Sequence, residues 1–385
     1  MLEQAIGDYL EWMRASGYAE SGLKAYEKIL KRFLWFVREK GIALDDVFTW
    51  DTVRAFQGRN PSTEVQRVLK KCARYLFEHK RITRPLKRQY YKLPALYEQY
   101  VAYYEKAHQV PSGKMISVQR VLSAFNEYLE DSKITLSRIR IEQIDAFLAE
   151  FTKPFKQSTC RLYRSYLRGF LRYLYHQKRI LRRDLAPLVV GAPQFAKAIP
   201  PKFLRPEEVS RLFCKMSQHL SSQRELRTYA MLHLAYFLGL RPREISMITL
   251  DDISFTRGEL SITHRKNTTP LTLPLPDETL KAISAYLIGG RPKSEYRNLF
   301  LALKAPFIPV TPATVSYWIS TSMRALNLPS TAYWLRHTYA QNLLESGRSL
   351  YETKEMMGHT SIESTRKYLH VHLHLMRKVL FDEKV

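Results

Sequence analysis

Apolar side chains recur every three or four residues along most of this chain. In one early segment the spacing runs through Tyr26, Ile29, Leu30, Phe33 and Val37. This spacing places the side chains on one face of a helix, where they can be buried together. Few segments show the alternation of apolar and polar residues that marks a strand. The pattern therefore predicts a mainly α-helical protein.

The first half of the chain contains one helical pattern twice. The aromatic positions Tyr9, Phe33 and Phe56 align with Tyr100, Phe125 and Phe147, at an offset of 91–92 residues. The copies end in RYLFEHKRI (74–82) and RYLYHQKRI (172–180), after a short insertion around residues 152–157. Because this period exceeds that of solenoid repeats, it predicts a tandem duplication of one helical domain.

The second half begins after a proline-rich stretch. Residues 186–202 contain four prolines and show no clear periodicity, which predicts an extended linker. Helices are then expected over 204–220 and 224–240, followed by two short β-like runs around a polar turn near Lys266. We therefore expect helical domains at 1–93 and 94–185, a linker at 186–203 and an α+β domain at 204–385.

The charge of the chain points to a polyanionic partner. Lys and Arg number 61 against 36 Asp and Glu, a net charge of +25, spread as about +8 over 1–93, +8 over 94–199 and +9 over 200–385. Nucleic acid is favoured over a membrane because no apolar run reaches about 18 residues. The candidate phosphate contacts, which alternatively form only a solvated basic face, are Arg161, Arg164, Arg168, Arg172, Lys178 and Arg179.

Cofactor chemistry finds no support in the sequence. Cys72, Cys160 and Cys214 are odd in number and widely spaced, which fits neither a disulfide framework nor a zinc site. No phosphate-binding glycine loop, C-x-x-C pair or H-E-x-x-H string occurs. The N-terminus lacks a charged segment followed by an apolar one. We therefore expect no metal, no cofactor, and a cytoplasmic location.

Three short strings in the last third carry candidate chemistry. GLRPREI contains Arg241 and Glu244, YWLRHT contains Tyr333 and Arg336, and MGHTSIESTRKY places Tyr368 nine residues after His359. Taken singly, each of these side chains is most often an ordinary surface or core residue. Together with Lys266, they supply the cations, acid and hydroxyl that phosphodiester transfer requires.

In order, spacing and wording these strings resemble the tyrosine recombinase (phage integrase, Xer-like) family. The resemblance covers residues 95–385, and residues 1–93 as an additional copy of the helical domain. It implies two tandem SAM-like core-binding domains before a mixed helical catalytic domain with a small β-sheet. In the family the core-binding domain occurs once, so the partner of the first copy is left open.

The resemblance also implies roles for single residues. Tyr368 would attack a DNA phosphate to give a 3′-phosphotyrosine, and Lys266 would protonate the leaving 5′ oxygen. Glu244 would orient Arg241, and the groups expected to hold the phosphate oxygens are Arg241, Arg336 and His359. Tyr333 stands where the family has a histidine, and a phenol with a pKa of about 10 accepts a proton poorly near neutral pH.

The partners implied are double-stranded DNA with a specific recombination site and three further copies of the chain, forming a tetramer on two sites. A stripe of Leu369, Leu373, Met376 and Leu380 would dock on a neighbouring protomer, or else cover its own domain. An accessory DNA-bending or directionality protein and a nucleoid location also follow from the resemblance.

The expected role is integration, excision or transposition of a mobile element. The alternatives are a type IB-like topoisomerase and a catalytically weak architectural DNA-binding protein.

Overall fold

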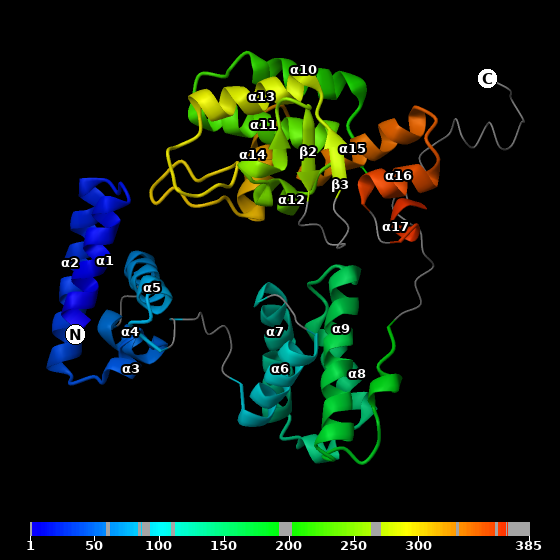
Figure 1. Cartoon of the computed structure of the whole chain (residues 1–385). Helices are drawn as coiled ribbons and strands as arrows, with labels where there is room; N and C mark the ends of the chain where they lie inside the picture. The colour runs from blue at the N-terminus through cyan, green and yellow to red at the C-terminus, as the bar shows by residue number, and fades with distance from the viewer. Residues whose placement is uncertain are drawn as a thin grey trace, which may run out of the picture. The chain divides into compact units, whose positions relative to one another are not determined.

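The computed structural model describes most of the chain, and its compact parts form two units. One unit contains Met1–Ala5 and Ile29–Ala196, and the other contains Ile6–Lys28 and Lys197–Val385. The described residues are 2–58, 62–83, 86, 93–108, 112–191, 202–262, 271–328, 331–358, 361–366 and 368. Over these residues the chain is mainly helical with one three-stranded sheet, which confirms the predicted fold class (Figure 1).

One succession of helices occurs twice in the first half of the chain. The first copy runs α1 (Leu2–Ala15), α2 (Glu20–Glu39), α3 (Leu44–Val47), α4 (Trp50–Gln57) and α5 (Thr63–Glu78). The second runs α6 (Ala95–His108), α7 (Ser112–Asp131), the 3₁₀ turn η1 (Leu136–Arg138), α8 (Ile141–Phe151) and α9 (Gln157–Arg172). Each element of the second copy thus has a counterpart at the same place in the first.

An aromatic contact is also repeated in the two copies. Phe33 and Phe56 pack edge to face with ring centroids 5.1 Å apart. The residues aligned with them, Phe125 and Phe147, pack edge to face at 5.0 Å. Edge-to-face pairs at this separation are favourable because the positive ring edge meets the negative face. Positions that align in sequence therefore make the same contact in space.

The structure corrects the start of the predicted linker. Residues 186–189 were expected to be extended, but Ala186–Leu188 form the 3₁₀ turn η3. Ala186 and Val189 are buried in the core of the second copy. Pro187 is compatible with the turn because the first helical positions need no N–H donor, and the Asp184 carboxylate accepts the Ala186 N–H at 3.0 Å. Residues 192–201 of the predicted linker lie outside the described residues.

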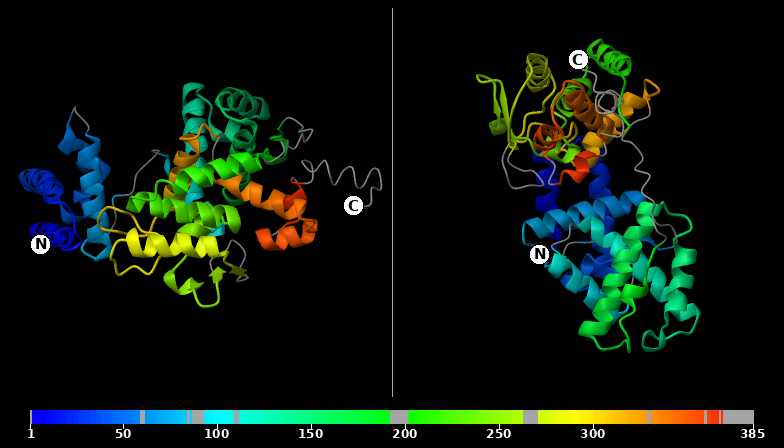
Figure 2. Two further views of the ribbon diagram at one scale, coloured as in Figure 1. Left: turned by 90° about the horizontal axis from the view of Figure 1, so that it is seen from above. Right: turned by 90° about the vertical axis from the view of Figure 1, so that its right-hand side faces the viewer.

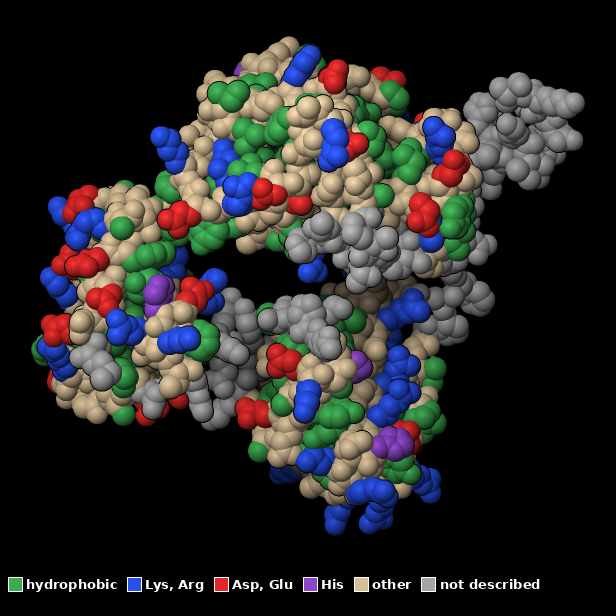
Figure 3. Space-filling view, in the orientation of Figure 1, with side chains coloured by type: hydrophobic (Ala, Val, Ile, Leu, Met, Phe, Trp, Pro, Cys, Tyr) green, Lys and Arg blue, Asp and Glu red, His purple; other side chains and the backbone are tan. Residues whose placement is uncertain are grey.

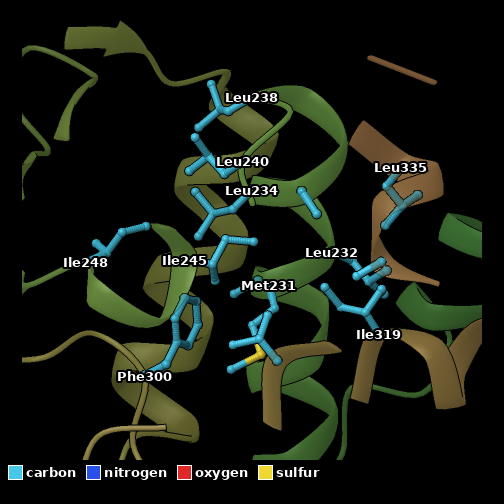
Figure 4. Packing of buried hydrophobic residues seen from close by; sticks show 14 of the residues in the cluster. Met231, Leu232, Leu234, Leu238, Leu240, Ile245, Ile248, Phe300, Ile319 and Leu335 are labelled. Carbon is cyan, nitrogen blue, oxygen red and sulfur yellow. The ribbon is translucent and has the colours of Figure 1, made fainter. Parts of the chain in front are cut away.

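The second half of the chain is built around helix α11. The helices here are α10 (Pro206–Ser217), α11 (Gln223–Phe237), α12 (Pro242–Met247), α13 (Asp277–Gly289), α14 (Pro312–Arg324), α15 (Ala332–Glu345), α16 (Leu350–Met357) and α17 (Glu363–Arg366). Helix α11 packs against α12, α13, α14 and α15, and α13 (yellow) runs beside it (green) in the left view of Figure 2. Met231, Leu232 and Leu234 of α11 are fully buried, in the cluster drawn in Figure 4. Burial of each such side chain contributes about 1.5–3 kcal/mol.

The small sheet is an antiparallel meander at the edge of this helical part. It consists of β1 (Ile253–Ser254), β2 (Glu259–Ile262) and β3 (Leu271–Pro274), in the order β1-β2-β3. Strands β2 and β3 pair from Glu259 opposite Pro274 to Ile262 opposite Leu271. The two predicted β-like runs are therefore confirmed as a hairpin. Lys266, placed by the sequence in the connection between them, lies outside the described residues.

Candidate active site

Arg241 is held where the chain leaves α11 and enters α12. Gly239 has a φ of +60°, and a Cβ atom there would lie 2.3 Å from the Tyr339 ring, so only glycine fits this turn. Pro242 then occupies the first turn of α12. The Glu244 carboxylate accepts the backbone N–H of Arg241 at 2.8 Å, which satisfies an otherwise unpaired donor at the helix start.

Glu244 is a buried carboxylate shared by two arginines. Its Oε1 accepts a hydrogen bond from Nη1 of Arg241 at 2.7 Å, and its Oε2 lies 3.9 Å from Nη1 of Arg336. The Glu244 and Arg336 side chains are 3% and 4% exposed, whereas that of Arg241 is 23% exposed. A buried carboxylate needs such partners, because burial of an unpaired charge is costly. Glu244 therefore sets the direction of the Arg241 guanidinium group and offsets part of the charge of Arg336.

Two backbone carbonyls, each at the end of a helix, also hold Arg336 in place. Its guanidinium donates to the Gly239 carbonyl and, at 2.6 Å, to the carbonyl of Met357, the last residue of α16. Gly358 then closes α16 in the left-handed conformation, and its carbonyl accepts from Nη2 of Arg241 at 3.5 Å. The two arginines are thus locked between the end of α11, the start of α12 and the end of α16.

Tyr368 is buried in the same site. It is 1% exposed and packs with Ala340, Leu344 and Met357. Burial raises the pKa of its hydroxyl to about 12, although the Arg336 and Arg241 guanidinium groups act in the opposite direction. The phenol is therefore protonated at neutral pH. Of the predicted catalytic residues, the structure brings Arg241, Glu244, Arg336 and Tyr368 together within one chain.

His337 is a member of the site that the sequence interpretation did not include. Its Nδ1 lies 2.7 Å from the Tyr368 hydroxyl oxygen, and the ring centroids are 5.6 Å apart. The residue directly follows Arg336 on α15, and this Arg-His pair was the available sequence indication. Tyr333, at the place of the usual family histidine, is instead 48% exposed. His359 lies outside the described residues, directly after Gly358.

The basic residues predicted to meet phosphate lie on α9 and just beyond it. Arg161 and Arg172 are exposed, Arg164 and Arg168 are half-buried, and Lys178 and Arg179 are exposed after the helix. Figure 3 shows Lys and Arg side chains in a column along α9. The helix contains no Asp or Glu of its own. Its face therefore presents positive charge that is not neutralised within the helix.

Two negative findings concern the described part of the chain. Within it, no three or more His, Cys, Asp and Glu side chains gather in a way that could hold a metal ion. No helix among the described residues is both long and apolar enough to cross a membrane.

Comparison with known proteins identifies the family. The phage integrase family model matches residues 202–374, and the model of the phage integrase N-terminal SAM-like domain matches residues 97–178, in the second copy. The tyrosine recombinase XerD of Listeria innocua is 30% identical over 264 residues, covering 66% of this chain and 86% of that protein. The chain therefore belongs to the tyrosine recombinase family, and it is a site-specific DNA recombinase.

Two further matches extend over nearly the whole chain. The "Putative integrase/recombinase y4rA" of Sinorhizobium fredii is 26% identical over 382 residues, covering 96% of this chain and 91% of that protein. The crystal structure of the XerH site-specific recombinase bound to a palindromic difH substrate has a TM-score of 0.62. It is 18% identical and covers 93% of this chain and 97% of that chain, a likeness of fold.

Proposed function

We propose that this recombinase cleaves and rejoins DNA through a 3′-phosphotyrosyl intermediate formed by Tyr368. The observation that carries the proposal is a site in which the buried Tyr368 hydroxyl contacts His337 and lies within electrostatic range of the Arg336 and Arg241 guanidinium groups. Attack by the hydroxyl oxygen on phosphorus expels the 5′ oxygen of the next nucleotide. The energy of the phosphodiester is kept in the tyrosyl bond, so rejoining requires neither ATP nor metal.

Stabilisation of the transferring phosphate is the proposed role of Arg241 and Arg336. A planar guanidinium donates two parallel hydrogen bonds to phosphate oxygens, and both groups are oriented before DNA arrives, by Glu244 and by the backbone carbonyls. Such preorganised donors need no rearrangement as charge develops, and this is usually the largest catalytic contribution. His359, which follows Gly358, completes the set of proposed donors.

Lys266 is the proposed general acid for the leaving 5′ oxygen. We expect Lys266→Ala to slow cleavage of ordinary DNA by about 10²–10⁴-fold, and to slow cleavage of a substrate with a 5′-bridging sulfur far less. A thiolate leaves without protonation, so the acid becomes dispensable. Single-turnover rates on the two substrates test this. Equal losses would show that Lys266 only positions the phosphate.

The arginine face of α9 is the proposed contact with the DNA backbone. Arg74 of α5 occupies the position of Arg172 in the other copy, but it donates to Glu78 at 2.8 Å. Because Glu78 offsets the charge of Arg74, Arg74 serves as a matched control for Arg172.

We expect Arg172→Ala to weaken binding and to reduce the slope of log affinity against log salt by about 0.9, the value for one phosphate contact. Arg74→Ala should leave the slope nearly unchanged, because its charge is already offset. Titration of duplex DNA at several salt concentrations measures both. Identical slopes for the two variants would assign the DNA contact to other residues.

Four protomers are the proposed active assembly. Exchange of two duplexes requires four strand cleavages, and each chain contributes one Tyr368, so a tetramer on two sites supplies one nucleophile per strand. We place the protein on the nucleoid, acting on the ends of a mobile element. The basis for this role is the similarity of nearly the whole chain to an integrase/recombinase.

Trapping the covalent intermediate tests the proposal. The substrate is a duplex from the DNA that flanks the gene, nicked so that cleavage releases a short fragment and prevents rejoining. We expect an adduct that survives denaturation, maps to Tyr368 by mass spectrometry and leaves a 5′ hydroxyl that polynucleotide kinase can label. An adduct with the opposite polarity, or none at any flanking site, would contradict it. Relaxation of supercoils without a defined site would favour a topoisomerase.

A further inference from the structure

The proposed chemistry leaves one proton without an acceptor. Tyr368 attacks as an oxygen nucleophile, yet burial keeps its phenol protonated at neutral pH. Its proton must therefore leave as the bond to phosphorus forms. In this chain a tyrosine, Tyr333, stands at the place of the usual histidine, and that side chain is half-exposed. The guanidinium groups of Arg241 and Arg336 cannot take the proton, because they stay protonated in proteins.

His337 lies where an acceptor is required. Its Nδ1 is 2.7 Å from the Tyr368 hydroxyl oxygen, which is within the range for direct proton transfer. Nδ1 of a neutral imidazole protonated on Nε2 is a lone-pair acceptor. The contact joins residues 31 positions apart, from α15 and from the segment after α17. It therefore depends on the folded site and not on a local turn.

We propose that His337 Nδ1 takes the Tyr368 proton during DNA cleavage and returns it during rejoining. This inference rests on the proposed function. In the forward step the O–H bond breaks as the N–H bond forms, while the P–Oη bond forms and the bond from phosphorus to the 5′ oxygen breaks. The 5′ oxygen receives its own proton from the general acid. In the reverse step the imidazolium protonates the departing tyrosine oxygen.

The charges of the site couple this transfer to DNA binding. The imidazolium would form in a site that already holds the Arg241 and Arg336 guanidinium groups around the Glu244 carboxylate. A bound phosphodiester adds one negative charge, and its transition state adds more. The imidazolium is then compensated. The negative charge of the bound phosphate therefore stabilises the protonated form of His337 that the proposed transfer produces.

The test separates proton transfer from simple positioning of the phenol. His337→Asn keeps a side-chain polar atom close to the position of Nδ1 but removes the base. It is combined with Tyr368 or with a polyfluorinated tyrosine at 368, whose phenol is far more acidic than that of tyrosine and therefore depends much less on a base. Single-turnover cleavage of the nicked duplex is measured for both nucleophiles. His219→Asn, at an exposed histidine, is the matched control.

We expect His337→Asn to slow cleavage by about 10²–10⁴-fold with tyrosine, the usual contribution of a general base. With the fluorinated tyrosine the loss should fall below about tenfold. Equal losses with both nucleophiles, or no loss with either, would overturn the inference. Should His337→Asn not fold, His337→Ala replaces it. Added imidazole should then restore cleavage by filling the vacated space, and a failure to restore it would count against His337 as the base.

Failure of this inference is distinguishable from failure of the proposed function. The unmodified protein must first form the Tyr368 adduct on the same duplex. Without that adduct, the phosphotyrosyl mechanism itself is wrong. If the unmodified protein forms the adduct and His337→Asn cleaves DNA at the same rate, the phosphotyrosyl mechanism is correct, but another group accepts the Tyr368 proton.

Discussion

Tyr368→Phe is expected to remove covalent attachment to DNA almost completely, by at least about 10⁴-fold, as loss of a nucleophile does in other covalent enzymes. Only the attacking oxygen is lost, and the buried ring remains among Ala340, Leu344 and Met357. DNA affinity should therefore be nearly unchanged. The missing hydrogen bond to His337 should change the free energy of unfolding by only about 0.5–1.5 kcal/mol. The adduct assay and a binding titration measure the two effects.

The control for this variant is Tyr351→Phe. Tyr351 lies on α16 and is 63% exposed, so loss of its hydroxyl should affect neither the adduct nor binding. An adduct that persists in Tyr368→Phe would move the nucleophile to another residue. A protein that no longer binds DNA would instead mean that the Tyr368 hydroxyl helps to assemble the binding surface.

Arg336→Lys is expected to reduce the cleavage rate by about 10³–10⁵-fold, comparable to loss of an arginine that stabilises a phosphoryl transition state. A lysine keeps the charge near Glu244 but has one nitrogen. It cannot donate to the Gly239 and Met357 carbonyls and still hold phosphate in a planar fork. Arg336→Ala should also lower the free energy of unfolding by about 1–3 kcal/mol, because the Gly239 and Met357 carbonyls lose their donor while Glu244 keeps its pair with Arg241. Single-turnover kinetics and chemical denaturation measure these effects.

Arg348→Lys is the matched substitution at the surface. Arg348 pairs with Glu352 at 3.8 Å, and its side chain is 58% exposed. An exposed pair of this kind contributes roughly 0–1 kcal/mol, so the rate and the stability should both be close to those of the unmodified protein. A loss as large as that of Arg336→Lys would indicate a general intolerance of lysine in this region. An active Arg336→Lys protein would show that charge alone suffices at this position.

The fold was largely predictable from the sequence because its repeats and helices follow from local patterns. The aligned phenylalanines of the two copies make the same contact, and the hairpin lies where alternation indicated it. Helix limits were less accurate. The helix expected at 204–220 is Pro206–Ser217, because proline sets its start. The linker was placed too early because a proline in a buried 3₁₀ turn looks the same in sequence as one in an extended segment.

Within the site, the sequence indicated the charged residues but not what holds them. The strings around Arg241, Arg336 and Tyr368 are distinctive, and the structure brings these residues together. The acceptors of Arg336 are backbone carbonyls 97 and 21 residues away, and such contacts leave no pattern of side-chain types. His337 was overlooked for a related reason. Its contact with Tyr368 joins residues 31 positions apart, so the sequence alone presents His337 only as the neighbour of Arg336.

Because Arg336 is held by the backbone carbonyls of Gly239 and Met357, its position depends little on which side chains the neighbouring residues carry. A main-chain oxygen cannot be deleted by substitution, so the side chain at 357 can vary without removing an acceptor, provided that α16 ends at the same place. Gly239 is the exception, because its conformation and the Tyr339 ring exclude other residues. Because Met357 is buried against Tyr368, substitutions at 357 that keep a buried apolar side chain and the same helix end are compatible with an intact reaction centre. Libraries that retarget the enzyme can randomise DNA-facing positions while three helix ends are kept constant.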